Sequence, residues 1–244
     1  MNSRYGNLVY GGVSSVQYGI YIADVNDDDM PSRDYSAISV PGRSRDIHFD
    51  NGRYANIDRT YKCAAYSMEG QRADERASAY IAKLMRLSGY QRIEDTLHPD
   101  YYKLGEFKGG TKPELAMDKN AALFDLVFDC DARKYLKSGE ISQPLSSGTQ
   151  TITNPETEPA SPMLVITGTG YVQIGGRRIT VSTNPGTMVI DCELGDAYAQ
   201  ATHVNYNSYI SLNSGDFPVL ESGANNITVS GLTSCLITPR WCKL

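Results

Sequence analysis

The sequence predicts a mainly β protein, with an α+β N-terminal half and an all-β C-terminal half. Short apolar runs that alternate with polar residues recur along the chain, which is the pattern of half-buried strands. One segment, Arg72 to Ser88, instead repeats its apolar residues with the 3.6-residue period of a helix. In the second half, short strands recur about every ten residues, as is typical of a β-sandwich or jelly roll. The length of 244 residues is enough for two ordinary domains.

A change in charge density divides the chain near residue 140. Residues 1–139 hold 19 Lys or Arg and 20 Asp or Glu, whereas residues 140–244 hold only 4 and 8. The second half is rich in Ser, Thr, Asn and Gly instead. Because four prolines fall between Ser138 and Pro162, we expect that stretch to be irregular. The predicted organisation is an N-terminal domain at 1–140, a linker with an opening strand at 141–162, and a C-terminal domain at 163–244.

The expected helix of the first half carries signals at both ends. Asp74 and Glu75 favour its positive N-terminal end, and Gly89 suits a left-handed cap. Pro41-Gly42 predicts a turn. The unusually polar residues that follow it, 43–54, predict either an arm that leaves the domain or an ordinary solvated hairpin. The expected strands of this half are 16–22, 37–40, 46–49, 57–65, 101–107 and 123–130.

In the second half, glycine pairs indicate where strands turn. We expect the strand 164–167 to end in a turn at Gly168-Thr-Gly170. Gly175-Gly176, between two apolar runs, predicts a two-residue hairpin. The remaining expected strands are 171–174, 178–181, 188–192, 209–212, 227–229 and 235–237.

Composition argues against several classes of protein. A net charge of −5 has the wrong sign for a nucleic-acid binder, and no apolar run approaches the ~18–20 residues that span a bilayer. The first residues lack the apolar stretch of a signal peptide, so we expect the product to stay in the cytoplasm where it is made. The five cysteines, which form no Cys-x-x-Cys motif, predict reduced thiols, with Cys130 on the buried face of a strand.

We expect no catalytic residue, no cofactor and no metal. Gly168-x-Gly170 lacks both the third glycine and the following helix that a dinucleotide needs. The acidic run 24–29 begins like a calcium loop but lacks its glycine and its bidentate glutamate, so we expect a solvated loop. Asp46, His48 and Asp50 alternate on one strand face, where we expect an exposed polar surface.

The end of the chain is its most informative segment. A strand runs to Ile237, Pro239 ends its ladder because it has no N–H to donate, and Arg240-Trp241 makes a terminal clasp. This ending resembles the terminal motif of siphophage distal tail proteins, with Cys242 in place of the second Trp. Other segments resemble the same family in the same order: Ser39–Arg43, Gly89–Tyr102, Phe128–Glu140, Thr167–Gly170, Ile190–Glu193, Ala197-Tyr198, Phe217–Leu220 and Gly223–Ile227.

The resemblance implies a fold and a set of structural residues. It implies an N-terminal domain of split-barrel or β-sandwich type with one helix, and a galectin-like jelly-roll C-terminal domain, with the last residues free to pack back on the N-terminal domain. Asp131-Ala132 departs from the family's usual Lys-Pro. The structural motif carried over is Gly168, Gly170, Asp191, Cys192, Pro239, Arg240 and Trp241. A possible inter-subunit arm comprises Pro41, Gly42, Arg43, Asp46, His48 and Asp50.

The resemblance also implies a role and partners. Distal tail proteins are structural components of the virion that form a sixfold ring, a homohexamer, between the tail tube protein and the tail-tip protein or tail-associated lysin. The tape measure protein is a further expected partner, and DNA passes through the ring without specific binding. Since acidic and basic residues nearly balance in the first half, we expect a neutral or acidic lumen.

Sugar binding is the alternative function. A β-sandwich rich in Ser, Asn and Thr, with Tyr171, Tyr198, Tyr206 and Tyr209, is compatible with a lectin-like adhesion module. A sugar site usually needs an exposed aromatic platform beside convergent polar groups, and the single Trp lies at the extreme terminus. The loops at 140–162 and 199–208 are the places where we would expect such a site.

Overall fold

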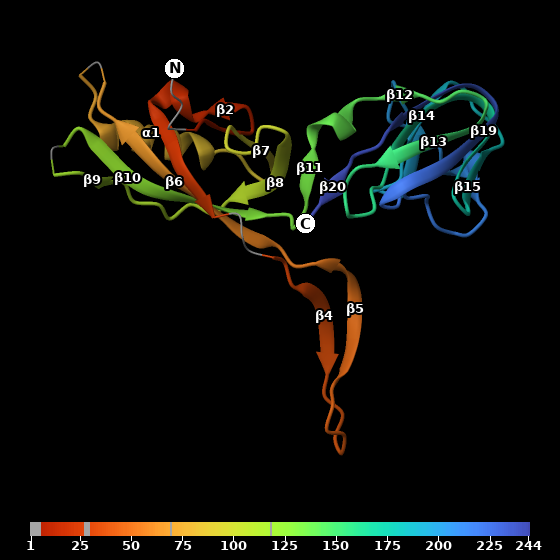
Figure 1. Ribbon diagram of the computed structural model, residues 1–244, viewed down its shortest axis with the longest axis horizontal. Coiled ribbons are helices and arrows are strands. Elements are labelled where there is room, and N and C mark those ends of the chain that lie inside the picture. Colours follow the sequence, from red (N-terminus) through yellow and green to blue (C-terminus); the bar gives the residue numbers. More distant parts are fainter. Residues whose placement is uncertain (1–5, 27–29, 69, 118) are drawn as a thin grey trace. The chain divides into compact units, whose positions relative to one another are not determined.

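The computed structural model describes residues 6–26, 30–68, 70–117 and 119–244. The chain forms two compact units, residues 1–134 with Leu244 and residues 135–243, and each is described by itself (Figure 1). Strands predominate, and the described residues contain a single α-helix, which confirms the predicted mainly β fold. Within the described part of the chain, no helix is both long and apolar enough to cross a membrane.

The first unit is built on one antiparallel sheet with the strand order β2-β1-β7-β8-β10-β6-β3. The longest pairing joins β10 to β6, from Ala121 opposite Tyr66 to Cys130 opposite Ile57. The elements are β1 (Leu8–Tyr10), β2 (Val13–Ser14), the 3-10 helix η1 (Ser15–Tyr18), β3 (Ile20–Asn26), β4 (Arg33–Ile38), β5 (Ile47–Tyr54), β6 (Ile57–Tyr66), α1 (Ala73–Leu84), β7 (Gln91–Asp95), β8 (Tyr101–Phe107), β9 (Glu114–Leu115) and β10 (Ala121–Cys130).

The helix α1 closes the core of this unit. Its apolar stripe, which includes Ala77, Tyr80 and Leu84, is fully buried against side chains of the sheet such as Leu126. The opposite helix face is polar, as the 3.6-residue period predicted. Burial of such side chains removes apolar surface from water and is the main contribution to the stability of the unit.

Two local predictions in the first half were wrong. The expected helix ends at Leu84 rather than Ser88, because Arg86 and Leu87 donate their N–H groups to the carbonyls three residues earlier and so tighten the chain out of α-helix. The expected strand at 16–22 begins as the 3-10 turn η1. Gly19, at a φ of 66°, ends that turn before β3 starts.

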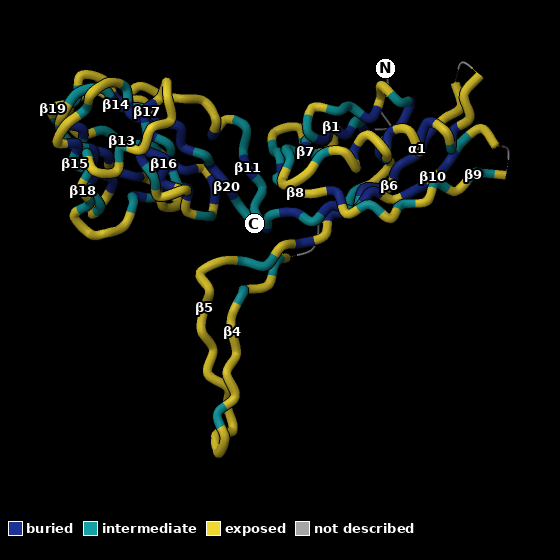
Figure 2. Tube along the Cα trace, turned by 180° about the vertical axis from the view of Figure 1, so that it is seen from behind, coloured by how far each residue is buried: buried dark blue, intermediate teal, exposed yellow. Residues whose placement is uncertain are grey.

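The strands β4 and β5 form a two-stranded sheet of their own, here called the arm (residues 33–54). Figure 2 shows the arm as almost entirely exposed. Val40-Pro41-Gly42-Arg43 connects its strands by a turn in which the N–H of Arg43 donates to the carbonyl of Val40. Gly42 has a φ of 82°, as the third position of a type II turn requires, so the predicted Pro41-Gly42 turn is confirmed.

The second unit is all β apart from short 3-10 turns. Its sheet has the order β12-β19-β14-β15-β18, with β13, β16 and β17 attached beside this path. From Lys134 onward the elements are β11 (Lys134–Leu136), η2 (Lys137–Glu140), β12 (Gln143–Pro144), β13 (Gly148–Asn154), β14 (Met163–Ile174), β15 (Arg177–Val181), β16 (Thr187–Asp191), β17 (Asp196–Ala199), η3 (Asn207–Tyr209), β18 (Ile210–Leu212), β19 (Gly223–Thr238) and β20 (Cys242–Lys243).

Two features of the second half differ from the sequence prediction. The stretch 138–162 is not irregular, since β12 and β13 pair with β19 along most of their length. Its prolines fall at strand ends and in loops, where a missing N–H costs no ladder bond. Gly168-Thr-Gly170 is a β-bulge inside β14 rather than a turn, because the pairing of β14 with β19 shifts register there and then continues.

Other predictions for this half, and one for the cysteines of both halves, are confirmed. Ile174 lies opposite Arg177, so Gly175-Gly176 is a two-residue hairpin between β14 and β15. The strand β19 ends at Thr238, directly before Pro239. All five cysteines are free and buried. Burial raises the pKa of Cys63, Cys130, Cys192 and Cys235 to about 12, which leaves these thiols protonated and unreactive at neutral pH.

Candidate interaction sites

The arm presents two different faces. On one face Ile38 lies opposite Ile47, and Phe49, two residues along the strand, is on the same side. All three side chains are exposed, Phe49 to 54%. On the other face the ring of Tyr35 stacks on His48, with ring centroids 4.4 Å apart. An exposed apolar face on a hairpin that pairs only with itself among the described strands is typical of a surface that contacts another chain.

Ion pairs cross the arm between its strands. Arg33 contacts Asp50 at 2.9 Å, and Arg53 contacts Asp34 at 2.6 Å. The N–H of Gly52 and the guanidinium of Arg33 lower the pKa of Asp50. Asn51 and Arg53 lower the pKa of Asp34 in the same way. These pairs hold the hairpin register, although their exposure to solvent keeps their contribution to stability small.

The six residues predicted for the arm all lie on it. Pro41, Gly42 and Arg43 are in the turn, Asp46 precedes β5, and His48 and Asp50 are on β5. On this face His48 stacks on Tyr35, and Asp50 pairs with Arg33. The described residues contain no group of three or more potential metal ligands. Of the predicted acidic loop at 24–29, residues 27–29 lie outside the described residues.

The residues of the terminal motif come together in the second unit. Arg240 donates from Nη1 and Nη2 to the two carboxylate oxygens of Asp191, at 2.7 and 2.8 Å. The Asp191 side chain is 5% exposed and that of Arg240 is 23% exposed. Desolvation raises the pKa of Asp191, but the hydrogen bonds from Arg240 and from the N–H groups of Leu194 and Glu193 outweigh it, so the pKa of Asp191 lies below its ordinary value.

The backbone around this pair is equally constrained. Arg240 has a φ of 60° and donates its N–H to the carbonyl of Gly139. A Cβ on Gly139 would lie 2.4 Å from the nitrogen of Trp241, so only glycine fits. The Trp241 side chain is 4% exposed and packs in the core of the second unit, and the neighbouring Cys192 is also buried there. We call Asp191, Arg240, Trp241 and Gly139 the clasp.

The remaining motif residues, Gly168 and Gly170, allow two strands to approach closely. A Cβ on Gly170 would lie 2.1 Å from the carbonyl oxygen of Ser230, and one on Gly168 would lie 2.7 Å from the hydroxyl of Thr233. Both glycines have positive φ values. Since they lie inside the pairing of β14 with β19, they serve the sheet and do not form a phosphate-binding loop.

The four tyrosines considered for sugar binding are partly buried in packing contacts. The guanidinium of Arg178 lies 4.3 Å from the ring centroid of Tyr171. Tyr206 and Tyr209 meet edge to face and pack against the core, and Tyr198 stacks on His203. None of the four is an exposed aromatic side chain. They therefore provide no ready platform for a sugar ring.

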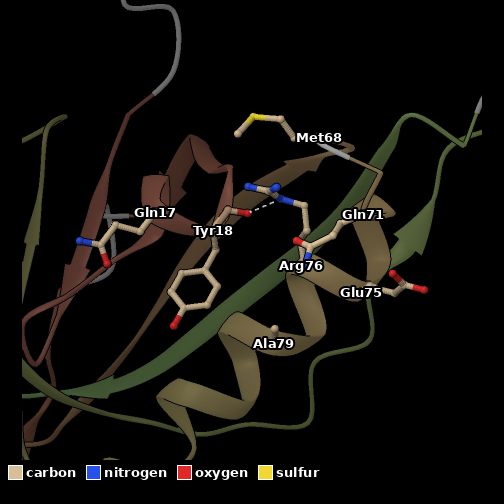
Figure 3. Close-up of a pocket in the computed structure, with 7 residues that line it drawn as sticks. All are labelled: Gln17, Tyr18, Met68, Gln71, Glu75, Arg76 and Ala79. Carbon is tan, nitrogen blue, oxygen red and sulfur yellow. Dashed lines mark hydrogen bonds between the residues drawn. The ribbon is translucent and has the colours of Figure 1, made fainter.

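A polar hollow in the first unit was not predicted from the sequence. It has a volume of about 390 Å³ and lies between η1, the turn before α1, and the first turns of α1. Figure 3 shows Arg76 of α1 reaching toward Tyr18 of η1. The Nε of Arg76 donates to the Tyr18 carbonyl at 2.8 Å. The lining residues are Gln17, Tyr18, Met68, Gln71, Glu75, Arg76 and Ala79.

Comparison with known proteins gives structural matches but no sequence matches. No protein-family model matches the chain, and no curated protein matches it. Dit of phage SPP1, described as a paradigm of the hub adsorption apparatus in phages that infect Gram-positive bacteria, aligns with a TM-score of 0.69 at 13% identity. The match covers 95% of this chain and 97% of that chain. This chain has the fold of SPP1 Dit.

Two structures of the phage P2 baseplate in its activated conformation also match. The one with Ca aligns at a TM-score of 0.52 and the one with Sr at 0.50, each at 8% identity and with 96% of both chains covered. The matches extend over both units of the chain rather than over one of them. The shared fold agrees with the resemblance carried by the sequence motifs.

Proposed function

We propose that this protein is the distal tail protein, the baseplate hub, of a long-tailed bacteriophage or prophage. The observation that carries the proposal is the match to SPP1 Dit across nearly the full length of both chains. The ordered sequence motifs support it independently, because they do not depend on the superposition. Fold alone does not determine function, so the agreement of the two observations matters.

The chemistry of such a protein is association rather than catalysis. We propose that residues 1–140 build a closed ring, a homohexamer, by a heterologous contact whose rotation closes, and that residues 163–244 form an outward-facing, galectin-like domain. The arm supports this proposal, since its exposed Ile38, Ile47 and Phe49 offer an apolar face to a neighbouring subunit. The pairing of arm residues with that neighbour is the proposed inter-subunit contact.

The ring would join the tail tube protein to the tail-tip protein or tail-associated lysin, with the tape measure protein as a further partner, in the virion. DNA would pass through its lumen without specific binding. Lys and Arg rings would hold phosphate groups there, so we expect a neutral or acidic lumen. A ring structure with a continuous basic lumen would contradict this part of the proposal.

Negative-stain imaging of the purified full-length chain, at about 0.1 mM because ring closure depends on concentration, tests the proposal. We expect ring-shaped particles with sixfold symmetry. Particles the size of a single chain, in the absence and presence of the purified tail tube protein, would contradict it. A glycan array on the same sample tests the sugar-binding alternative, for which we expect no specific binding.

A further inference from the structure

We propose that the hollow at the start of α1 binds a single carboxylate group, an Asp or Glu side chain presented by a partner protein. Arg76 forms its floor. This residue is 8% exposed, and its only side-chain hydrogen bond among the described residues is the one from Nε to the Tyr18 carbonyl. The two terminal nitrogens, Nη1 and Nη2, are therefore available to a ligand.

The position of the guanidinium is fixed by its surroundings. Gly19 lies directly against it, since a Cβ at that residue would come within 2.5 Å of Nη2. The Tyr18 carbonyl holds Nε from the side, and the ring of Tyr18 packs on Tyr80 with centroids 5.3 Å apart. A guanidinium held in one orientation binds a planar carboxylate by two parallel hydrogen bonds with little loss of side-chain freedom.

Electrostatics favours an anion at this position. A guanidinium carries a positive charge, and a partly buried hollow screens its attraction for an anion less than bulk water does. Among the described residues no carboxylate lies within ion-pairing distance of Arg76. The hollow also opens beside the first turns of α1, where the helix dipole is positive.

Other lining residues restrict which anion fits. Glu75 adds one negative charge to the hollow, which disfavours a phosphate dianion more than a singly charged carboxylate. Gln17 and Gln71 supply amide groups that can donate to the same ligand. Met68, which is 52% exposed, offers apolar contact to the methylene groups of an amino-acid side chain.

The assignment of the carboxylate to a partner protein rests on the proposed hub function. The binding of a carboxylate in the hollow does not rest on it. The two can therefore fail separately. If no ring forms but the hollow takes a carboxylate, the hub proposal fails alone. If rings form but the hollow takes none, the present inference fails alone.

Nuclear magnetic resonance on the full chain labelled with ¹⁵N-arginine and ¹⁵N-glycine tests the inference, through the Arg76 Nε–H and the Gly19 amide. N-acetyl-aspartate amide is the probe, and N-acetyl-asparagine amide and inorganic phosphate are the matched controls. We expect saturable shifts of both signals with the aspartate probe, and binding at least about tenfold weaker with either control. The absence of saturable shifts, or equal binding of a control, would overturn the inference.

Two variants sharpen the test. Arg76→Lys keeps the positive charge but loses the two parallel N–H donors of the guanidinium. We expect this variant to bind the aspartate probe about tenfold more weakly, as measured by the shift of the Gly19 amide signal. Glu75→Gln removes the competing charge, and we expect it to bind the probe about threefold more tightly. If Arg76→Lys does not fold, Glu75→Gln decides the matter, because unchanged or weaker binding in that variant overturns the inference.

Discussion

The arm and the clasp use the same pair of side chains in different surroundings. In the arm, Arg33 and Asp50 meet at 2.9 Å with 70% and 53% of their side chains exposed. In the clasp, Arg240 and Asp191 meet at 2.7 Å with 23% and 5% exposed. Water screens the first pair and competes for it, whereas the second is largely withdrawn from water. Distance alone therefore does not say what an ion pair contributes; burial does.

The apolar side chains of the clasp and the arm also differ in burial. The clasp buries Trp241 in the core of the second unit, but the arm leaves Ile38, Ile47 and Phe49 exposed. The clasp thus stabilises its own unit, and the arm carries apolar surface that is of use only when another chain covers it.

The largest effect is expected for Trp241→Ala. Loss of this side chain from the core should lower the free energy of unfolding of the second unit by about 3–5 kcal/mol. Urea titration followed by far-ultraviolet circular dichroism measures it, and the two units are expected to give separate transitions. The matched arm variant, Phe49→Ala, should change neither transition by more than about 0.5 kcal/mol. Equal effects of the two variants would contradict the contrast.

Arg240→Met should have the next largest effect. It leaves the Asp191 carboxylate buried without its partner, which we expect to cost about 2–3 kcal/mol, less than a fully buried pair because Arg240 is partly exposed. The same urea titration measures it. Arg33→Met in the arm is the control and should cost less than about 0.5 kcal/mol. A clasp variant as stable as the wild type would show that the pair contributes nothing to folding.

Acid should weaken the clasp once the pH falls far enough to protonate Asp191. The folded pKa of Asp191 is lowered, so its contribution to stability is fully present above the unfolded value of about 3.9 and is lost as the pH falls through the folded pKa. Thermal melts of the second unit between about pH 6 and pH 2.5 should show this loss. In the Asp191→Asn variant, the part of the stability loss between about pH 6 and about pH 2.5 that comes from protonation of Asp191 should be absent. A variant with the same pH profile as the wild type would contradict the assignment.

The smallest effect is expected for the ion pairs of the arm. A double-mutant cycle on Arg33→Ala and Asp50→Ala should give a coupling free energy close to zero, because both side chains are largely exposed. Because screening weakens such a pair, the coupling should vanish at about 1 M salt. A coupling free energy as large as the effect of Arg240→Met, and independent of salt, would mean that the arm pairs act like the clasp.

The sequence correctly predicted turns and strand ends that depend only on neighbouring residues. Pro41-Gly42 and Gly175-Gly176 formed the expected turns, and Pro239 directly follows the last residue of β19, as its missing N–H predicted. Cys130 was correctly placed on a buried strand face. The turn expected at Gly168-Thr-Gly170 was wrong, because a positive-φ glycine serves a bulge as well as a turn, and pairing with the distant β19 decides between them.

The sites depend on contacts between distant residues, which the sequence does not encode locally. The family resemblance pointed to both Asp191 and Arg240. It did not predict that these two residues, 49 positions apart in the sequence, bind one another. Arg76 gave no signal, since an arginine on an amphipathic helix normally lies in solvent. Only the closeness of Gly19 and the Tyr18 carbonyl, from another part of the chain, shows that it is buried.

Light scattering on two forms of the full chain tests the central claim, that the arm serves association while the clasp serves folding. One form is the wild type, and in the other a short Gly-Ser turn replaces residues 33–54. At about 0.1 mM we expect a mass of about 160 kDa, six times the 26.8 kDa of one chain, for the wild type. We expect a single-chain mass and unchanged urea transitions for the armless form. A ring that assembles equally well without the arm would contradict the account.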